Sequence, residues 1–227
     1  MNQKAEFIQK LKSGYFGNNK RKLRSALIAM KLEIRSIDIS GVNLSGMNLS
    51  AVDFKGANMG GINLSESNLK QAYLRGVNLG GANLSYAIMD KVDMEGSNLG
   101  GANMAYAKLS NANMRGTSLS GAYLGYALIK NAILTDAYLW GVYLRGCDLS
   151  NSKLNGAYLK GADLKGAVLL NVDLHGTDMK GANVHGMKIN KNNLKPLLIA
   201  CGAIEDSEFT VNSIYENIAK KIGDIVV

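Results

Sequence analysis

The sequence predicts an all-β solenoid, which is a stack of short coils, with helical segments at both ends. Two observations predict this fold class. An apolar residue recurs at every fifth position from Ile39 to Leu194 without interruption. Residues twenty positions apart also match, as in the glycine column from Gly41 to Gly181. A period of five fits neither an α-helix nor a β-strand, and a second period of twenty indicates that four units close one coil. The thirty-two units therefore predict about eight coils.

Each five-residue unit predicts two buried and three exposed positions. The large central residue, such as Leu84, and the small residue two positions before it, such as Ala82, are both apolar. The residue between them and the two that follow the centre are mostly Asn, Asp, Ser or Gly. Hydroxyl residues replace the small apolar residue in some units, for example Ser67, Ser97, Thr117 and Ser152, and Asn192 breaks the pattern in the last unit.

The pattern resembles the A(D/N)LXX repeat of the pentapeptide repeat family. Two units that carry the resemblance are Gly81-Ala82-Asn83-Leu84-Ser85 and Gly161-Ala162-Asp163-Leu164-Lys165. The resemblance covers about 70% of the chain. It implies a right-handed quadrilateral β-helix in which the central and small residues point inward and the other three point outward.

The organisation expected from the sequence has three parts: 1–36 a helical N-terminal cap, 37–195 the repeats, and 196–227 a helical C-terminal cap or oligomerisation module. Caps are expected because an open solenoid exposes its core and unpaired backbone at its ends. Apolar residues predict N-terminal helices over 6–11 and 19–31.

The basic face of the second N-terminal helix is formed by Lys20, Arg21, Lys22 and Arg24. It is either simply solvated or contacts an acidic partner.

The C-terminal part predicts two features. Residues 195–202 are expected to form a short helix that closes the last coil, and 213–216 read as a capping box. The apolar stripe that follows is Ile214, Ile218 and Ile222. This segment folds back on the rod or pairs with a second chain. Because the C-terminal module of gyrase-protecting family members makes a dimer, the resemblance favours a homo-oligomer, as a dimer or larger.

Composition suggests a cytoplasmic protein. No run of about 18 apolar residues is present, so no transmembrane segment is expected, and residues 1–12 lack the apolar core of a secretory signal. Cys147 and Cys201 do not make a disulfide framework, which favours a reducing compartment. The net charge of +8 is unevenly distributed. The first 38 residues contribute much of it, because they contain nine Lys or Arg against three Asp or Glu.

No arrangement of residues indicates catalysis. The two histidines, His175 and His185, are two units apart and are therefore expected on opposite sides of a coil. Asp93 and Glu95 share a face, which is read as solvated surface. No phosphate-binding loop, CxxC pair or nucleophile elbow is present. The sequence thus predicts a non-enzymatic protein with no cofactor and no metal.

Two outward clusters interrupt the Asn, Ser and Gly background. The first is a candidate oligomer interface, together with the C-terminal isoleucines: Tyr86, Ile88, Tyr106, Lys108, Tyr126 and Leu128. The second is a candidate partner-binding site, with Lys165 and Lys180 beside it: Tyr123, Tyr138, Trp140, Tyr143, Arg145, Tyr158 and Lys160. Aromatic and Arg residues are typical of interface hot spots. The alternative for both clusters is that stacked tyrosines stabilise neighbouring coils.

Three functions are compatible with these surfaces. The leading one is a rigid, non-catalytic scaffold that binds an unknown protein partner. A second function is suggested by the resemblance to quinolone-resistance members, which modulate topoisomerase. Those members act as DNA mimics through an acidic surface, whereas residues 39–195 of this chain carry fifteen basic against ten acidic residues. The third is binding of nucleic acid or an anionic membrane through the basic regions, which would depend steeply on salt.

Overall fold

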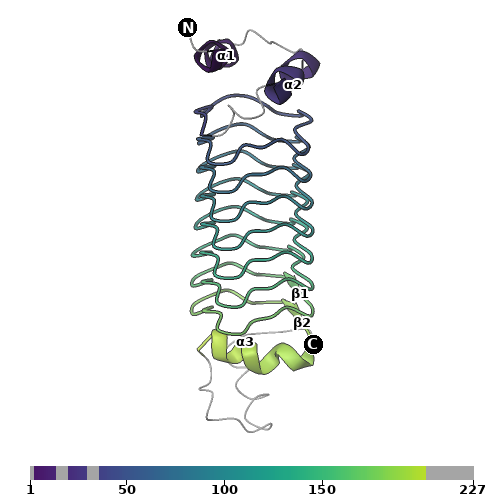
Figure 1. Ribbon diagram of the computed structural model, residues 1–227. Coiled ribbons are helices and arrows are strands. Elements are labelled where there is room, and N and C mark those ends of the chain that lie inside the picture. Colours follow the sequence, from purple (N-terminus) through teal and green to yellow (C-terminus); the bar gives the residue numbers. More distant parts are fainter. Residues whose placement is uncertain (1–2, 14–19, 30–35, 203–227) are drawn as a thin grey trace.

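The chain forms a rod of stacked coils with helices at its two ends (Figure 1). The computed structural model describes residues 3–13, 20–29 and 36–202. Helices α1 (Gln3–Lys12) and α2 (Lys20–Ala29) lie at one end of the rod, and helix α3 (Leu194–Ala200) lies across the other. None of the described helices is both long and apolar enough to span a membrane.

Successive coils pair as parallel β-bridges. Each bridge joins residues twenty positions apart, as in Asn83 with Asn103. The Leu84 N–H donates to the Asn103 carbonyl at 2.6 Å, and the Asn103 N–H donates to the Ala82 carbonyl at 2.9 Å. Within residues 3–13, 20–29 and 36–202, one pairing is two residues long, between β1 (Val168–Leu169) and β2 (Lys188–Ile189). The period of twenty seen in the sequence is therefore the spacing of hydrogen-bonded neighbours.

The core is a dry column filled by the central and small residues of each unit. Leu84 and Ala82, for example, have no exposed surface. The hydroxyls at small positions are satisfied by backbone carbonyls: Ser67 Oγ donates to Leu64 at 2.7 Å, and Thr117 Oγ1 donates to Met114 at 2.7 Å. No buried side-chain N or O atom in the described part lacks a hydrogen-bond partner. These hydroxyls are thus accommodated without an uncompensated polar group.

Each corner between units requires a residue with positive φ, the region that favours glycine. Glycine fills most corners, but three consecutive coils place tyrosine there, with φ of 58° at Tyr86, 59° at Tyr106 and 58° at Tyr126. A left-handed backbone costs an L-residue roughly 1–2 kcal/mol. These three side chains therefore occupy positions where glycine is the less strained choice.

The helices at the N-terminal end bury apolar residues that belong to the same cluster as the coil interior, namely Phe7 and Leu11 of α1 and Leu23 of α2. On the basic face predicted for the second helix, Arg21 and Lys22 are exposed. The side chains of Lys20 and Arg24 are outside the described part.

The C-terminal end differs from the repeat pattern in one respect. The unit that the spacing places at Leu194 does not form, because residues Lys191–Asn193 are a 3₁₀ turn and α3 starts at Leu194. The physical reason is Asn192, a polar residue at the small inward position, which is exposed instead. The Met179 N–H donates to the Ala200 carbonyl of α3 at 2.8 Å, so the helix takes the place of a further coil there.

The predicted apolar stripe of Ile214, Ile218 and Ile222 lies outside the described residues.

Replacing a corner tyrosine tests whether it is there for stability. Tyr106→Gly removes ring contacts that are worth about 0.5–1.5 kcal/mol each, but it relieves backbone strain of similar size. We expect the free energy of unfolding, from urea denaturation, to change by less than about 1 kcal/mol. Lys91→Gly is the control, because Lys91 has a φ of 58° at another corner without a ring stack; it should be neutral or stabilising. A loss above about 2 kcal/mol for Tyr106→Gly would show that the rings mainly stabilise the coils.

Candidate partner-binding surface

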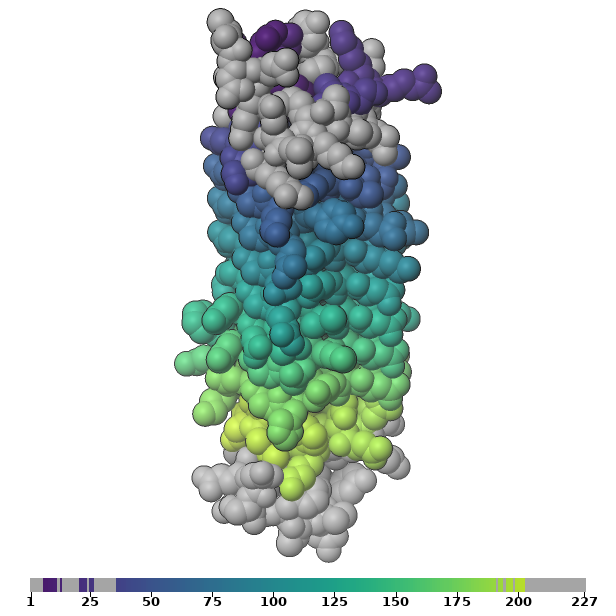
Figure 2. Space-filling view, viewed as in Figure 1, coloured from purple at the N-terminus to yellow at the C-terminus, as the bar shows by residue number. Residues whose placement is uncertain are grey.

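The second aromatic cluster of the sequence lies on two adjoining sides of the rod. We call them side A, which carries Tyr138, Trp140 and Tyr158, and side B, which carries Tyr123 and Tyr143. In each coil the unit on side A is followed directly by the unit on side B, and Gly141 turns the corner between Trp140 and Tyr143. All five rings are exposed, Trp140 at 52%. Figure 2 shows bulky side chains standing out from one edge of the green part of the rod. We refer to these five residues as the aromatic surface.

The rings stack from coil to coil. Tyr123 and Tyr143 have centroids 4.7 Å apart and planes 1° apart, and Tyr138 and Tyr158 are 5.3 Å and 7° apart. Trp140 lies edge-on to that second pair, with interplanar angles of 77° to Tyr138 and 74° to Tyr158. The tyrosine faces are therefore turned toward each other, and their edges and hydroxyls are the parts offered to a ligand.

This geometry disfavours base stacking by the tyrosines. Single-stranded nucleic acid is bound by stacking bases on open aromatic faces. In each tyrosine pair one face of each ring is already covered by its neighbour. The outward edges carry the positive part of the ring quadrupole and so suit anionic or hydrogen-bonding groups.

Earlier coils show what the fold uses at the same positions. On side A, the Asn98 amide donates to Asn78 Oδ1 at 3.0 Å, and Asn98 Oδ1 accepts the N–H of Gly100 at 3.1 Å. A Cβ on Gly100 would lie 3.3 Å from that same oxygen, so glycine leaves room for the ladder. These amides are satisfied within the coil stack, which makes them structural.

The tyrosines lack the hydrogen bond that each Asn of the ladder accepts from the backbone N–H two residues later. In the Asn coils of side B, Asn103 Oδ1 accepts the N–H of Ala105 at 3.2 Å. A phenol cannot make this short bond, and the N–H groups of Gly125 and Arg145 have no such partner within the described part of the chain. Since a hydrogen bond contributes about 0.5–1.5 kcal/mol net, the tyrosines are not the residues that the coil itself favours.

The basic residues beside the aromatic surface differ in pairing. Arg145 Nε contacts Asp163 Oδ2 one coil further along. Lys160, Lys165 and Lys180 are exposed, and their side chains form no ion pair with any described carboxylate. Lys160 and Lys180 occupy the same position in successive coils. Like charges directly opposite in paired strands are unfavourable, so this arrangement is suited to an anionic partner.

The first cluster lies at the next corner of the rod. Tyr86 and Tyr106 stack at 4.9 Å, and Tyr106 and Tyr126 stack at 5.3 Å; we call these three the corner column. A Cβ on Gly146 would lie 2.7 Å from Tyr126 Cε1, so the last ring of the column rests on the residue that follows Arg145. The two clusters, which the sequence analysis predicted as separate, therefore meet in one continuous surface.

The residues Ile88, Lys108 and Leu128, which the sequence places beside the corner column, differ in exposure. Leu128 is 42% exposed and Lys108 is exposed, whereas Ile88 is half-buried. The expected patch is therefore smaller at its Ile88 end.

Asp93 and Glu95, read from the sequence as solvated surface, are ion-paired. Arg75 lies one coil away, with Nη2 at 2.5 Å from Glu95 Oε2 and Nε at 3.7 Å from Asp93 Oδ2. The period of twenty carries the signal, because Arg75 and Glu95 are column neighbours.

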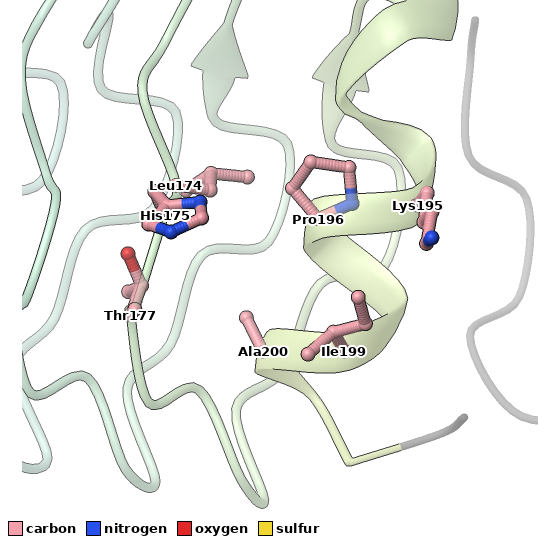
Figure 3. Close-up of a pocket in the computed structure, with 8 residues that line it drawn as sticks. Leu174, His175, Thr177, Lys195, Pro196, Ile199 and Ala200 are labelled. Atoms are coloured by element: carbon pink, nitrogen blue, oxygen red, sulfur yellow. The ribbon is translucent and has the colours of Figure 1, made fainter. Parts of the chain in front are cut away.

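A cavity that the sequence did not reveal lies between the last coil and α3 (Figure 3). Its volume is about 400 Å³, and it is lined by Leu174, His175, Gly176, Thr177, Lys195, Pro196, Ile199 and Ala200. It exists because α3 replaces the last predicted coil unit. The Thr177 hydroxyl donates to the Leu154 carbonyl at 3.0 Å. Among the described residues that line the cavity none is a carboxylate, and the titratable side chains there are those of His175 and Lys195.

The other titratable groups are spread out. His175 and His185 belong to units two apart, and the described residues contain no group of three or more His, Cys, Asp or Glu that could hold a metal ion. Burial raises the pKa of the Cys147 thiol, which has no exposed surface. Burial also raises the pKa of Cys201 to about 11. Both cysteines are free thiols.

The family of the chain follows from its sequence and fold together. The family model for Pentapeptide repeats matches overlapping segments at 35–71, 62–101, 97–136, 132–169, 147–186 and 157–194. The chain therefore belongs to the pentapeptide repeat proteins, which fold as right-handed quadrilateral β-helices and are generally structural or interaction proteins. Comparison with curated proteins finds no significant match.

Solved structures of pentapeptide repeat proteins resemble the chain. HetL, involved in heterocyst differentiation regulation in the cyanobacterium Nostoc sp. strain PCC 7120, is 27% identical over 71% of this chain and 78% of its own, with a TM-score of 0.30. A protein of the Arabidopsis thaliana thylakoid lumen is 32% identical over 46% and 70%, with a TM-score of 0.40. QnrB1, a plasmid-mediated fluoroquinolone resistance protein, is 17% identical over 76% and 93%, with a TM-score of 0.40.

The two thiols should react slowly in the folded protein. Because their pKa values are raised, the thiolate that attacks alkylating and disulfide reagents is scarce at pH 8. We expect Cys147 to be modified only after unfolding in denaturant. Cys201 should react faster as the pH rises toward its pKa of about 11. Mass spectrometry after timed exposure to iodoacetamide measures the labelling rate of each cysteine. Rapid labelling of Cys147 in the folded protein at pH 8 would contradict its burial in the core.

Proposed function

We propose that the protein is a non-catalytic scaffold whose aromatic surface binds a partner protein. One observation carries the proposal: tyrosine and tryptophan replace Asn and Gly on sides A and B, where the coil obtains its own hydrogen bonds from Asn and Gly. Stability alone favours continuing the ladder of Asn78 and Asn98. Exposed aromatic side chains next to Arg145 also have the composition of interface hot spots.

The scaffold is suited to this role because it is rigid. Each coil between the first and the last is hydrogen-bonded to the coils on both sides of it, and the inward residues are buried along the rod. A partner would meet side chains that are held in place before binding, which reduces the entropy lost on association.

The alternatives have weaker support. A topoisomerase-modulating role would need an acidic surface, whereas the repeats are net basic. Nucleic-acid binding is compatible with the lysines but is disfavoured by the tyrosine orientation, since one face of each tyrosine in the two pairs is covered by its neighbour. Localisation in the cytoplasm also remains part of the proposal.

The proposal predicts that binding can be removed without loss of stability. The double variant Tyr123→Asn with Tyr143→Asn restores the side-chain acceptors of the ladder, so its free energy of unfolding should fall by no more than about 1 kcal/mol. Affinity capture from the source cells should recover proteins with the wild type and lose them with this variant.

The matched control is Tyr73→Asn, since Tyr73 has the same place in its unit, is 52% exposed and makes no ring stack within the described chain. Retention of the same proteins by the double variant would contradict the partner site. Recovery of nucleic acid that is released by salt would favour the third function instead.

We also propose that the corner column mediates self-association. The supporting observation is the backbone strain at Tyr86, Tyr106 and Tyr126, which the coil does not require. The wild type should sediment as an oligomer, and Tyr106→Glu should sediment as a monomer, because it places a charge in an apolar contact. A wild type that stays monomeric over the tested concentrations, or an oligomer unaffected by Tyr106→Glu, would contradict this role.

A further inference from the structure

We propose that the acidic segment just after Gly202 binds in cis to the lysines and Trp140 of side A, covering part of the aromatic surface. The occupant is residues 203–209, Ala-Ile-Glu-Asp-Ser-Glu-Phe. These residues lie outside the described chain. The support comes from the surface next to Gly202 and from the order and charge of residues 203–209 in the sequence. An effect of this contact on partner binding rests on the proposed function, whereas the contact itself can be tested without a partner.

The first support is the point where the described chain ends. Helix α3 is followed by Gly202, whose N–H donates to the Ile199 carbonyl at 2.9 Å and whose φ is 66°. A Cβ on Gly202 would lie 3.4 Å from Cε and 3.5 Å from Cγ of Lys180. The chain therefore leaves its C-terminal helix against the aliphatic stem of Lys180, at the foot of side A.

The second support is the order of residues on side A. From the C-terminal end inward, one position of successive coils is occupied by Lys180, Lys160 and Trp140. Both lysines are exposed and form no ion pair with a described carboxylate, although each stands one coil from a like charge. The surface therefore offers two cations and then an exposed indole in one line.

The third support is that the segment after Gly202 has the complementary order. Glu205, Asp206 and Glu208 come first, and Phe209 follows. Coils are about 4.8 Å apart, so Lys160 lies one spacing and Trp140 two spacings beyond Lys180. Three extended residues span roughly 10 Å, which brings the first carboxylates within reach of both lysines. Seven residues reach Trp140 with length to spare.

The contact would supply ion-pair partners to Lys160 and Lys180. The carboxylate that side A itself offers, Asp178, accepts the backbone N–H of Lys180 and forms no ion pair with either lysine among the described residues. It also places an apolar side chain on Trp140 and so competes with a partner for the aromatic surface. A partner must then displace the segment, which lowers its apparent affinity by the fraction of molecules in which the surface is covered.

Trp140 reports on this contact directly, because it is the only tryptophan. We expect acrylamide to quench the Trp140 fluorescence about twofold more strongly in the full-length variant Glu205→Lys, Asp206→Lys, Glu208→Lys than in the wild type. At about 0.5 M salt, where screening is strong, quenching of the wild type should rise toward the value of this variant. The control is Glu216→Lys with Asp224→Lys, which makes similar charge changes further along the segment and should quench like the wild type.

A charge exchange separates contact from altered folding. Lys160→Glu with Lys180→Glu should raise quenching as the first variant does, and combining the two sets should return it to the wild-type value. Equal quenching in the wild type and the triple-lysine variant overturns the proposal, as does protection of Trp140 that increases with protein concentration, since that indicates binding between copies. Retention of the captured proteins by the Tyr123→Asn, Tyr143→Asn variant, with the quenching difference unchanged, would refute the proposed function and leave this contact intact.

Discussion

The positive φ required at one residue in every five is the constraint on which the structure depends. Each such residue turns the chain from one side of the coil to the next. Four turns bring residues twenty positions apart together as bridge partners, as in Asn83 and Asn103. The inward residues can then be small and large in alternation, because the corner fixes which of them face the axis. The same constraint makes the outward positions independent of the core, so the aromatic surface can exist without altering the packing beneath it.

Much of the fold could be predicted because the coil is defined by local spacing. The unbroken positions from Ile39 to Ile189 indicated the inward column, and the period of twenty indicated which side chains are neighbours, including the tyrosine stacks. The end of the array was harder to predict. Leu194 keeps the spacing but begins a helix, since a unit forms only when its small position can be buried, and Asn192 cannot be. The cavity beside α3 follows from that helix and has no signature in the repeat.

The candidate surface was predicted in composition but not in geometry. The sequence columns placed Tyr123 and Tyr143 in neighbouring coils, but they could not show that the two rings stack face to face and so cover one face of each ring. They also could not show that Tyr126 reaches across to Gly146 and joins the two clusters. The meaning of the tyrosines became clear only by comparison with the asparagine ladder, since the hydrogen bonds of Asn98 show what an unmodified coil does at that place.

The coil ladder also determines how such a protein can change in length. Removing twenty residues takes away one complete coil and leaves every later side chain on its original side. Removing five residues between Tyr106 and Trp140 preserves the core equally well. It rotates all later coils by a quarter of the circumference relative to the earlier ones. Trp140 and Lys180 would then be carried around the rod together, while Tyr106 stayed in place. Length variation in multiples of twenty thus preserves a binding surface, and variation in multiples of five rearranges it without any change in the interior.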